Sequence, residues 1–123
     1  MLKLSNRPQM NGQQTIAKMQ TSAEHADTLT RRYKNIYDHA NRSYNRMCET
    51  YRAAKKLGKP TESISANLDK AWTARMSAED DYERHKDLAA ELWSEYRYAE
   101  EELETALKIQ RWWLKVSYAR RAY

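Results

Sequence analysis

The stretch KKLGKPTESI, Lys55–Ile64, holds the residues that decide the fold. Gly58 and Pro60 are the only glycine and proline after position 12, so helix-breaking residues gather at this one place. Glycine suits the left-handed residue that follows a helix, and proline cannot continue one. Thr61 or Ser63 can cap the start of a following helix. The stretch therefore predicts that one helix ends before Gly58 and that a second begins directly after Pro60.

Apolar residues before this turn recur at alternating steps of three and four. Eleven of the twelve positions on this repeat are apolar or tyrosine. They are Ile16, Met19, Ala23, Ala26, Thr30, Tyr33, Tyr37, Ala40, Tyr44, Met47, Tyr51 and Ala54. An average step of 3.5 residues keeps one stripe of a helix facing a partner helix along its whole length.

The same repeat continues after the turn, where ten of twelve positions fit and Arg75 and His85 are the exceptions. The twelve are Ile64, Leu68, Ala71, Arg75, Ala78, Tyr82, His85, Ala89, Leu92, Tyr96, Ala99 and Leu103. We call the two stripes together the seam. If the chain folds back at the turn, the numbers of facing residues add up to 118 or 119. The sequence therefore predicts an all-α fold, a long antiparallel two-helix coiled-coil hairpin.

This register predicts specific neighbours. Met47 should contact Ala71, and Tyr37 should contact Tyr82. Other layers set a large side chain against a small one, as filling a seam requires.

The expected boundaries are an extended N-terminal arm over 1–13, a helix over 14–57, a turn over 58–60 and a second helix over 61–123. At a rise of ~1.5 Å per residue the first helix spans about 65 Å and the second about 90 Å. The second helix therefore overhangs the first from about residue 105. The arm can return to cover the apolar side of this overhang with Leu2, Leu4 and Met10.

The composition restricts the class of protein. A length of 123 residues suits one domain. Cys48 is the only cysteine, which rules out an intramolecular disulfide and favours a reducing compartment. No apolar run approaches the roughly 18 residues of a membrane span, and the first ten residues lack the apolar core of a signal peptide. We expect a protein that is neither transmembrane nor secreted by a signal peptide, located inside a cell or within a virus particle.

Large apolar side chains outside the seam are candidates for a partner interface. They belong to the second helix and its C-terminal end: Trp72, Trp93, Leu107, Trp112, Trp113, Leu114 and Tyr118. Indole side chains are enriched at the centres of protein interfaces, which favours docking of another subunit. The alternative is that those beside the seam broaden it and stay half exposed.

Charge is divided unevenly along the chain. Residues 1–60 carry a net charge of +8, and residues 79–104 carry −8. The outward cations of the first helix are Arg31, Arg32, Arg42, Arg46, Arg52 and Lys56. The outward carboxylates of the second are Asp80, Glu83, Asp87, Glu91, Glu101 and Glu104. These faces are either solvated, or the basic back of one hairpin lies against the acidic back of the next in a head-to-tail array.

Motifs for chemistry are missing from the sequence. The three histidines and Cys48 lack the spacing of metal ligands, and no glycine-rich phosphate loop or nucleophile motif occurs. His85 should face Tyr33, and we interpret it as a residue that specifies the register rather than as a catalyst. We therefore expect no enzyme activity, no metal, no cofactor and no small-molecule substrate.

Three classes of function remain. The first is a structural or adaptor subunit that binds protein partners, either copies of itself or other subunits; a small component of a virus particle is one form of it. The second is a nucleic-acid-binding helical protein. Its phosphate contacts, which would equally suit an acidic protein partner, would come from Arg31, Arg32, Arg42, Arg46, Arg52, Arg111, Arg120 and Arg121. The third is a protein that binds a membrane surface, since the C-terminal end mixes tryptophan, tyrosine and cations.

Overall fold

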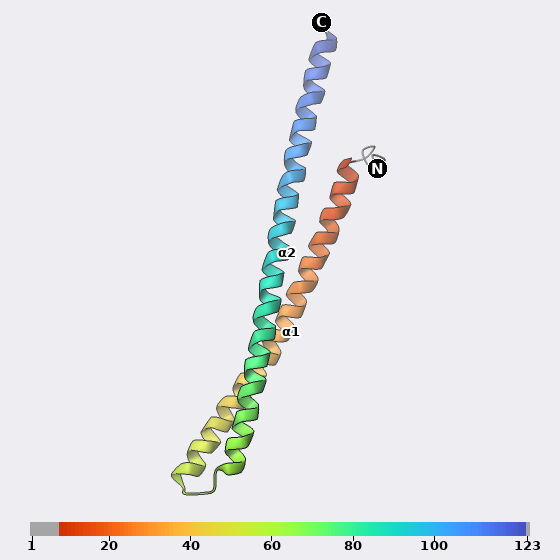
Figure 1. The fold of residues 1–123 in the computed structure, drawn as a ribbon. Helices are drawn as coiled ribbons and strands as arrows, with labels where there is room; N and C mark the ends of the chain where they lie inside the picture. Colours follow the sequence, from red (N-terminus) through yellow and green to blue (C-terminus); the bar gives the residue numbers. More distant parts are fainter. Residues whose placement is uncertain (1–7, 123) are drawn as a thin grey trace. The chain divides into compact units, whose positions relative to one another are not determined.

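Two long helices make up the structure, a computed structural model that describes the backbone of residues 8–122 and the side chains of residues 12–120. α1 spans Pro8–Lys56 and α2 spans Glu62–Ala122, and no strand occurs in the described backbone. The two helices pack against each other as an antiparallel hairpin (Figure 1). The predicted all-α helical hairpin is confirmed.

The turn between the helices forms at Gly58. This residue has a φ of 68°, the left-handed conformation that glycine adopts without a steric cost. The Gly58 amide donates to the carbonyl oxygen of Lys55 at 3.1 Å, and the Lys59 amide donates to that of Ala54 at 2.9 Å. This pair of hydrogen bonds is the Schellman motif, which satisfies carbonyl groups left open at a helix end.

The start of α2 follows within a few residues. Thr61 is the last residue before the helix, and its carbonyl oxygen accepts the first helical hydrogen bond from the Ser65 amide at 2.8 Å. Glu62 then places a carboxylate in the first turn, where the helix dipole stabilises negative charge. Lys55 and Lys56 place cations in the last turn of α1, where the dipole has the opposite sign.

The start of α1 corrects one predicted boundary. We expected the first helix from about residue 14, whereas α1 begins at Pro8, so residues 8–13 of the expected extended arm are helical. Proline is well tolerated at the first position of a helix, where its missing amide has no partner to lose. Residues 1–7 of the arm, with Leu2 and Leu4, lie outside the described residues, as does the side chain of Met10.

The chain divides into two compact units, and the first of them, Ala26–Ala89, includes the turn. Aromatic layers connect its helices. The rings of Tyr37 and Tyr82 lie nearly parallel with centroids 6.1 Å apart, which confirms that predicted pairing. The ring of His85 stacks on Tyr33 at 4.0 Å, as the register requires. Met47 and Ala71 are both half-buried, and their contact stays a prediction.

Hydrogen bonds fix the layer around His85. Its Nδ1 lies 2.7 Å from the carbonyl oxygen of Asp81, and because a carbonyl can only accept, this nitrogen carries a proton. The Thr30 hydroxyl lies 2.8 Å from the carbonyl oxygen of Ala26 and 3.0 Å from that of His85. Thr30 and His85 therefore pair α1 with α2 through polar as well as aromatic contacts.

The second unit contains Met1–His25 and Ala90–Tyr123. Here Leu103 packs on the backbone of Gly12, since a Cβ built on this glycine would lie 3.1 Å from Leu103 Cδ1. In the seam register Pro8 lies level with residues 110–111, so residues 112–122 of α2 extend beyond the start of α1. We expected α2 to overhang α1 from about residue 105. The overhang is shorter because α1 begins at Pro8 and not at about residue 14.

The core of the hairpin is narrow. Every one of the 24 seam positions is buried or half-buried. The buried ones are all alanine: Ala23, Ala26, Ala54, Ala78 and Ala89. Alanine lets two helix backbones approach closely, while the larger seam residues lie at the edges of the interface and keep part of their surface in water. Neither helix, over the residues that the structure describes, contains a stretch long and apolar enough to cross a membrane.

Replacing Gly58 by alanine should lower the free energy of unfolding by about 1 kcal/mol, because a Cβ disfavours the left-handed conformation. Open space surrounds the position of that Cβ, so the cost arises in the backbone alone. Asparagine tolerates this conformation, so Gly58→Asn should keep most of the stability. Urea unfolding followed by circular dichroism measures both variants, and an equal loss in the two would contradict the argument.

Candidate protein interface

The C-terminal end of α2 carries large apolar side chains that remain in water. The exposed fractions of five of them range from 53% to 71%. They are Ile109, Trp112, Trp113, Leu114 and Tyr118. Of the predicted interface residues in this segment, only Leu107 is half-buried. The structure therefore brings the predicted residues Trp112, Trp113, Leu114 and Tyr118 together on one exposed helical segment.

The two adjacent tryptophans form a pair. The ring of Trp112 meets that of Trp113 edge to face, with centroids 5.1 Å apart and an angle of 75°. This is a favourable arrangement for aromatic rings. It holds the two indoles close together in water.

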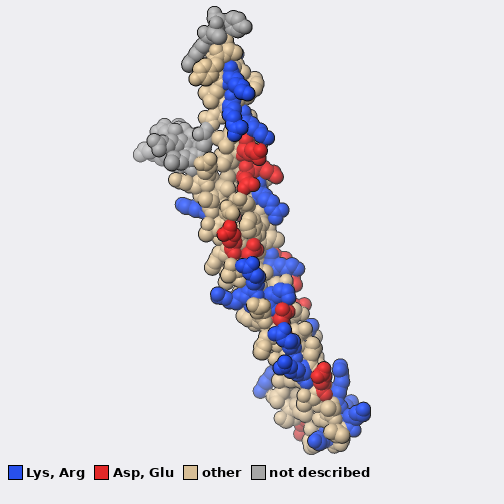
Figure 2. Space-filling model, turned by 180° about the vertical axis from the view of Figure 1, so that it is seen from behind, with Lys and Arg blue, Asp and Glu red and all other residues tan. Residues whose placement is uncertain are grey.

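Charged side chains on this end of α2 are ordered by sign. Lys108, Arg111 and Lys115 are exposed nearer the C-terminus, and Glu101 and Glu104 are exposed on the turns before them. Figure 2 shows, on the face in view, blue cations nearer the end of α2 and red carboxylates next to them. At the boundary the Lys108 ammonium lies 3.4 Å from a Glu104 carboxylate oxygen.

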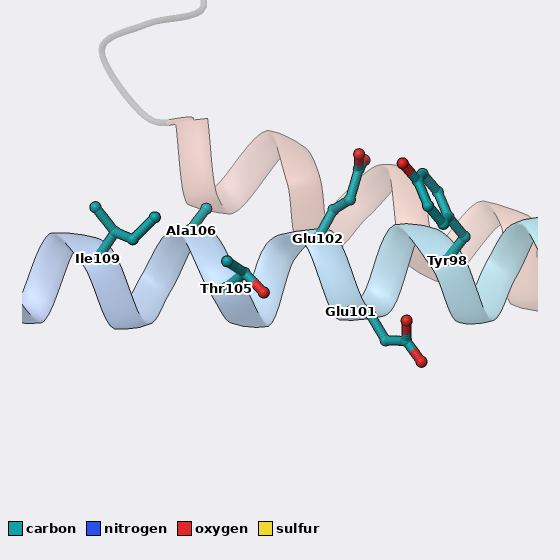
Figure 3. Close-up of a pocket in the computed structure, with 6 residues that line it drawn as sticks. All are labelled: Tyr98, Glu101, Glu102, Thr105, Ala106 and Ile109. Carbon is teal, nitrogen blue, oxygen red and sulfur yellow. The ribbon is translucent and has the colours of Figure 1, made fainter.

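A shallow hollow of about 470 Å³ lies along the same segment. Its lining residues all belong to α2: Tyr98, Glu101, Glu102, Thr105, Ala106 and Ile109. Figure 3 shows Tyr98 and Glu102 projecting from the same side of the helix, whereas Glu101 projects away from them. The hollow is a surface that a second helix can fill with side chains, rather than an enclosed pocket for a small molecule.

Tyr98 belongs to two hollows. It also lines a space of about 500 Å³ that Met19 of α1 shares with Ser94, Glu95 and Ala99 of α2. The Tyr98 side chain is nonetheless 65% exposed. Its ring therefore offers an aromatic surface beside the seam.

Trp93 and Tyr96 lie on α2 just before Tyr98. Their rings meet edge to face at 5.5 Å, and the Tyr96 hydroxyl donates to Glu100 Oε2 at 2.6 Å. This hydrogen bond raises the pKa of Tyr96 above its usual 10.0, because ionisation would lose it, and partial desolvation and the nearby carboxylates act in the same direction. Trp93, a predicted interface residue, is half-buried.

Trp72, the remaining predicted interface residue, lies in a cluster in the other unit. Its ring is 5.1 Å from that of Tyr44, and the Arg75 guanidinium lies 5.1 Å from its centroid. Arg75 Nε also donates to Asn41 Oδ1 at 2.7 Å, which connects α2 to α1. Trp72 is 44% exposed, so part of its surface stabilises the hairpin and part faces water.

The other predicted cations are spread along an exposed face of α1. Arg31, Arg32, Arg42, Arg46 and Arg52 are all exposed, and Arg31 lies 3.4 Å from the Thr28 hydroxyl. On α2, Arg111 and Arg120 are exposed, while the side chain of Arg121 lies outside the described residues. Their interaction with a phosphate or an acidic protein stays a prediction.

Within the described part of the chain, no three histidine, cysteine, aspartate or glutamate side chains come together as a metal site. Cys48 is half-buried, and its hydrogen bond with Tyr44 is the main cause that raises the pKa of that tyrosine. Both groups lie outside the candidate interface.

Three comparisons with known proteins leave the fold and surface as the only basis for function: no protein-family model, no curated protein and no solved structure matches this chain.

Tyr98 and Thr105 belong to the candidate interface but were not predicted from the sequence. They lie off the seam, and a search that follows one apolar repeat passes over them. A second search at the same alternating steps of four and three, started from Tyr98, leads to Thr105, Ile109 and Trp112. Such a search would have found this surface without a structure.

Trp72→Ala should lower the free energy of unfolding by about 1–2 kcal/mol, because it removes the contacts with Tyr44 and Arg75. Trp112 is more than half exposed, and its ring contact is with Trp113 of the same helix. Trp112→Ala should therefore change the free energy of unfolding by less than about 0.5 kcal/mol. Chemical unfolding at submicromolar protein, where self-association is weak, compares the two variants. A larger loss for Trp112→Ala would mean that Trp112 belongs to the core of the fold.

Proposed function

We propose that this protein is a non-enzymatic structural or adaptor subunit that binds another protein through the C-terminal end of α2. The observation that carries this proposal is the exposure of Ile109, Trp112 and Trp113 together on one helical segment. Scattered single apolar residues are normal on a protein surface, but a contiguous group marks an interaction site.

The energetics support a protein partner. Transfer of two half-exposed indoles out of water contributes several kcal/mol at about 25 cal/mol per Å². That is enough to anchor a subunit when the surrounding side chains also pack. Tryptophan and tyrosine are typical of the energetically dominant positions of protein interfaces.

Shape supports the same class of partner. The surface is a helix face with a shallow hollow, lined by Tyr98, Ala106 and Ile109 among others. A partner helix that inserts side chains between such residues matches this form. Stacking with nucleic-acid bases needs open ring faces, and the edge-to-face contact of Trp112 with Trp113 occupies one of them.

The proposal predicts that position 112 crosslinks to protein. A photoreactive phenylalanine analogue in place of Trp112, in the full chain made in cells, should give an adduct of defined mass on irradiation. The same analogue in place of the exposed Lys70, near the turn, should give several-fold less. Trp113→Ala should reduce the adduct at position 112, because it removes a neighbouring part of the surface.

Two further measurements test the other classes of partner. Fluorescence anisotropy with a DNA duplex and flotation with vesicles of anionic lipid compare the wild type with the Trp112→Ala, Trp113→Ala variant. Binding to either ligand that depends on both tryptophans, without any protein adduct at position 112, would overturn the proposal.

A further inference from the structure

The exposed end of α2 carries a second apolar repeat, distinct from the seam. From Tyr98 the alternating steps of four and three reach six positions, of which four are apolar or aromatic. They are Tyr98, Glu102, Thr105, Ile109, Trp112 and Val116. At 3.6 residues per turn this stripe lies roughly 100° around the helix from the seam. We call it the second stripe, and all of its residues except the half-buried Val116 are exposed.

The repeat is that of a coiled coil. A stripe that recurs every 3.5 residues over nearly three heptads stays in line with a partner helix. α1 occupies the seam and does not occupy the second stripe, since Tyr98 and Ile109 remain 65% and 53% exposed. The second stripe is therefore a helix-packing surface that still lacks its helix in the structure of one chain.

The charges beside the second stripe indicate which helix fits. One flank carries Glu101 toward the N-terminus, Lys108 in the middle and Lys115 toward the C-terminus, at steps of seven; Glu104 and Arg111 lie further around the helix behind this flank, and all five are exposed. Residues on such flanks form ion pairs with the partner helix and set its orientation; in an antiparallel pair they face the same flank of the partner. The partner helix must therefore place basic residues beside the acidic part of this flank and acidic residues beside its basic part.

We infer that the second stripe binds the second stripe of another copy of this chain, with the two α2 helices antiparallel and the two-fold axis near residue 107. This inference rests on the proposed function and names its partner. An antiparallel copy presents the required order of charge, since reversing the helix exchanges its acidic and basic halves.

The ion pairs follow from the register. With the axis near residue 107, Glu101 of one copy faces Lys115 of the other, and this pair occurs twice because of the symmetry. Glu104 and Arg111, further around the helix, add charge of the same sign behind Glu101 and Lys115 respectively. Near the axis, Lys108 of one copy comes close to Lys108 of the other. The ion pair of each Lys108 with Glu104 of its own chain, at 3.4 Å, offsets the repulsion between the two ammonium groups. A parallel pair would instead place this flank against the opposite flank of the partner, where Glu101 would face Ala106 and no such ion pair would form.

The apolar layers follow from the same register. Tyr98 faces Val116, Thr105 faces Ile109, and Glu102 lies level with Trp112. The indole N–H groups of Trp112 and Trp113 can donate to the Glu102 carboxylate, so this polar residue has partners within the interface. The side chains of one copy thus fill the hollow beside Tyr98 and Ile109 in the other.

Two-fold pairing closes the assembly. Each copy uses the same surface, so association stops at a dimer and does not continue into a filament. Two helices that meet over about five turns bury an area near the lower limit of stable interfaces, so we expect dissociation in the micromolar range.

The test exchanges the charges on the flank. Glu101→Lys with Glu104→Lys makes both ends of the flank basic, and Arg111→Glu with Lys115→Glu makes both ends acidic. Each double variant of the full chain should dimerise at least about tenfold more weakly than the wild type, because like charges then face each other. An equimolar mixture of the two should recover the affinity, and so should the variant with all four substitutions.

Sedimentation equilibrium distinguishes a chain of 14.6 kDa from its dimer, and circular dichroism shows that each variant keeps its helices. Glu49→Lys with Asp69→Lys is the matched control for the Glu101→Lys, Glu104→Lys variant, since it makes the same change in net charge at exposed sites outside the second stripe. This control should dimerise like the wild type.

The outcomes separate this inference from the proposed function. A wild type that is monomeric at about 100 μM, or a four-fold variant that fails to dimerise while remaining helical, would overturn antiparallel self-pairing. A monomer that still crosslinks through position 112 to a different protein would leave the proposed function intact. A monomer without any protein adduct would overturn both.

Discussion

The two helices of this protein bury the seam against each other, and the small side chains in the seam determine how closely the helix backbones can approach. The buried positions are alanines, and among the described residues no large side chain is completely buried. The hairpin is therefore stabilised by many shallow layers rather than by a central core. Its stability depends on keeping all of these layers in register.

The two polar exceptions in the seam contribute to that register. Arg75 donates to Asn41 and lies over the rings of Tyr44 and Trp72, and His85 stacks on Tyr33. A slip of one heptad would separate the Arg75 guanidinium from Asn41 and would remove the Tyr33 ring from the His85 ring. The residues that fit the apolar repeat least are thus the ones that select a single alignment of the two helices.

Much of the fold could be predicted from spacing, because the repeat of the seam is a direct consequence of helix geometry. The pairing of Tyr37 with Tyr82 followed from the position of Gly58 and simple numbering. The start of α1 at Pro8 could not be obtained in this way, since the first residues lack an apolar repeat and proline is equally at home before a helix or at its first position.

The surface was predicted less completely than the seam. Trp112 and Trp113 were recognisable as apolar residues beyond the paired region. That Trp72 broadens the seam and stays half exposed was one of the two alternatives that the sequence left open. Its contact with the guanidinium of Arg75 could not be predicted, because periodicity does not determine where that group lies. Tyr98 was passed over because one tyrosine off the seam is unremarkable until its neighbours at matching steps are considered.

The tight turn at Gly58 also has a consequence for how the chain folds. Layers next to the turn close loops of only a few residues, and each later layer enlarges the loop slightly, so the entropy of closure accumulates in small steps. Such a hairpin can form by zipping outward from the turn, with local contacts at every stage and a correspondingly low barrier. In this order of folding the contact of Gly12 with Leu103, which is far from the turn, forms among the last. The segment that carries the second stripe is then also the first to fray, so a partner that binds it slows unfolding at the point where unfolding starts.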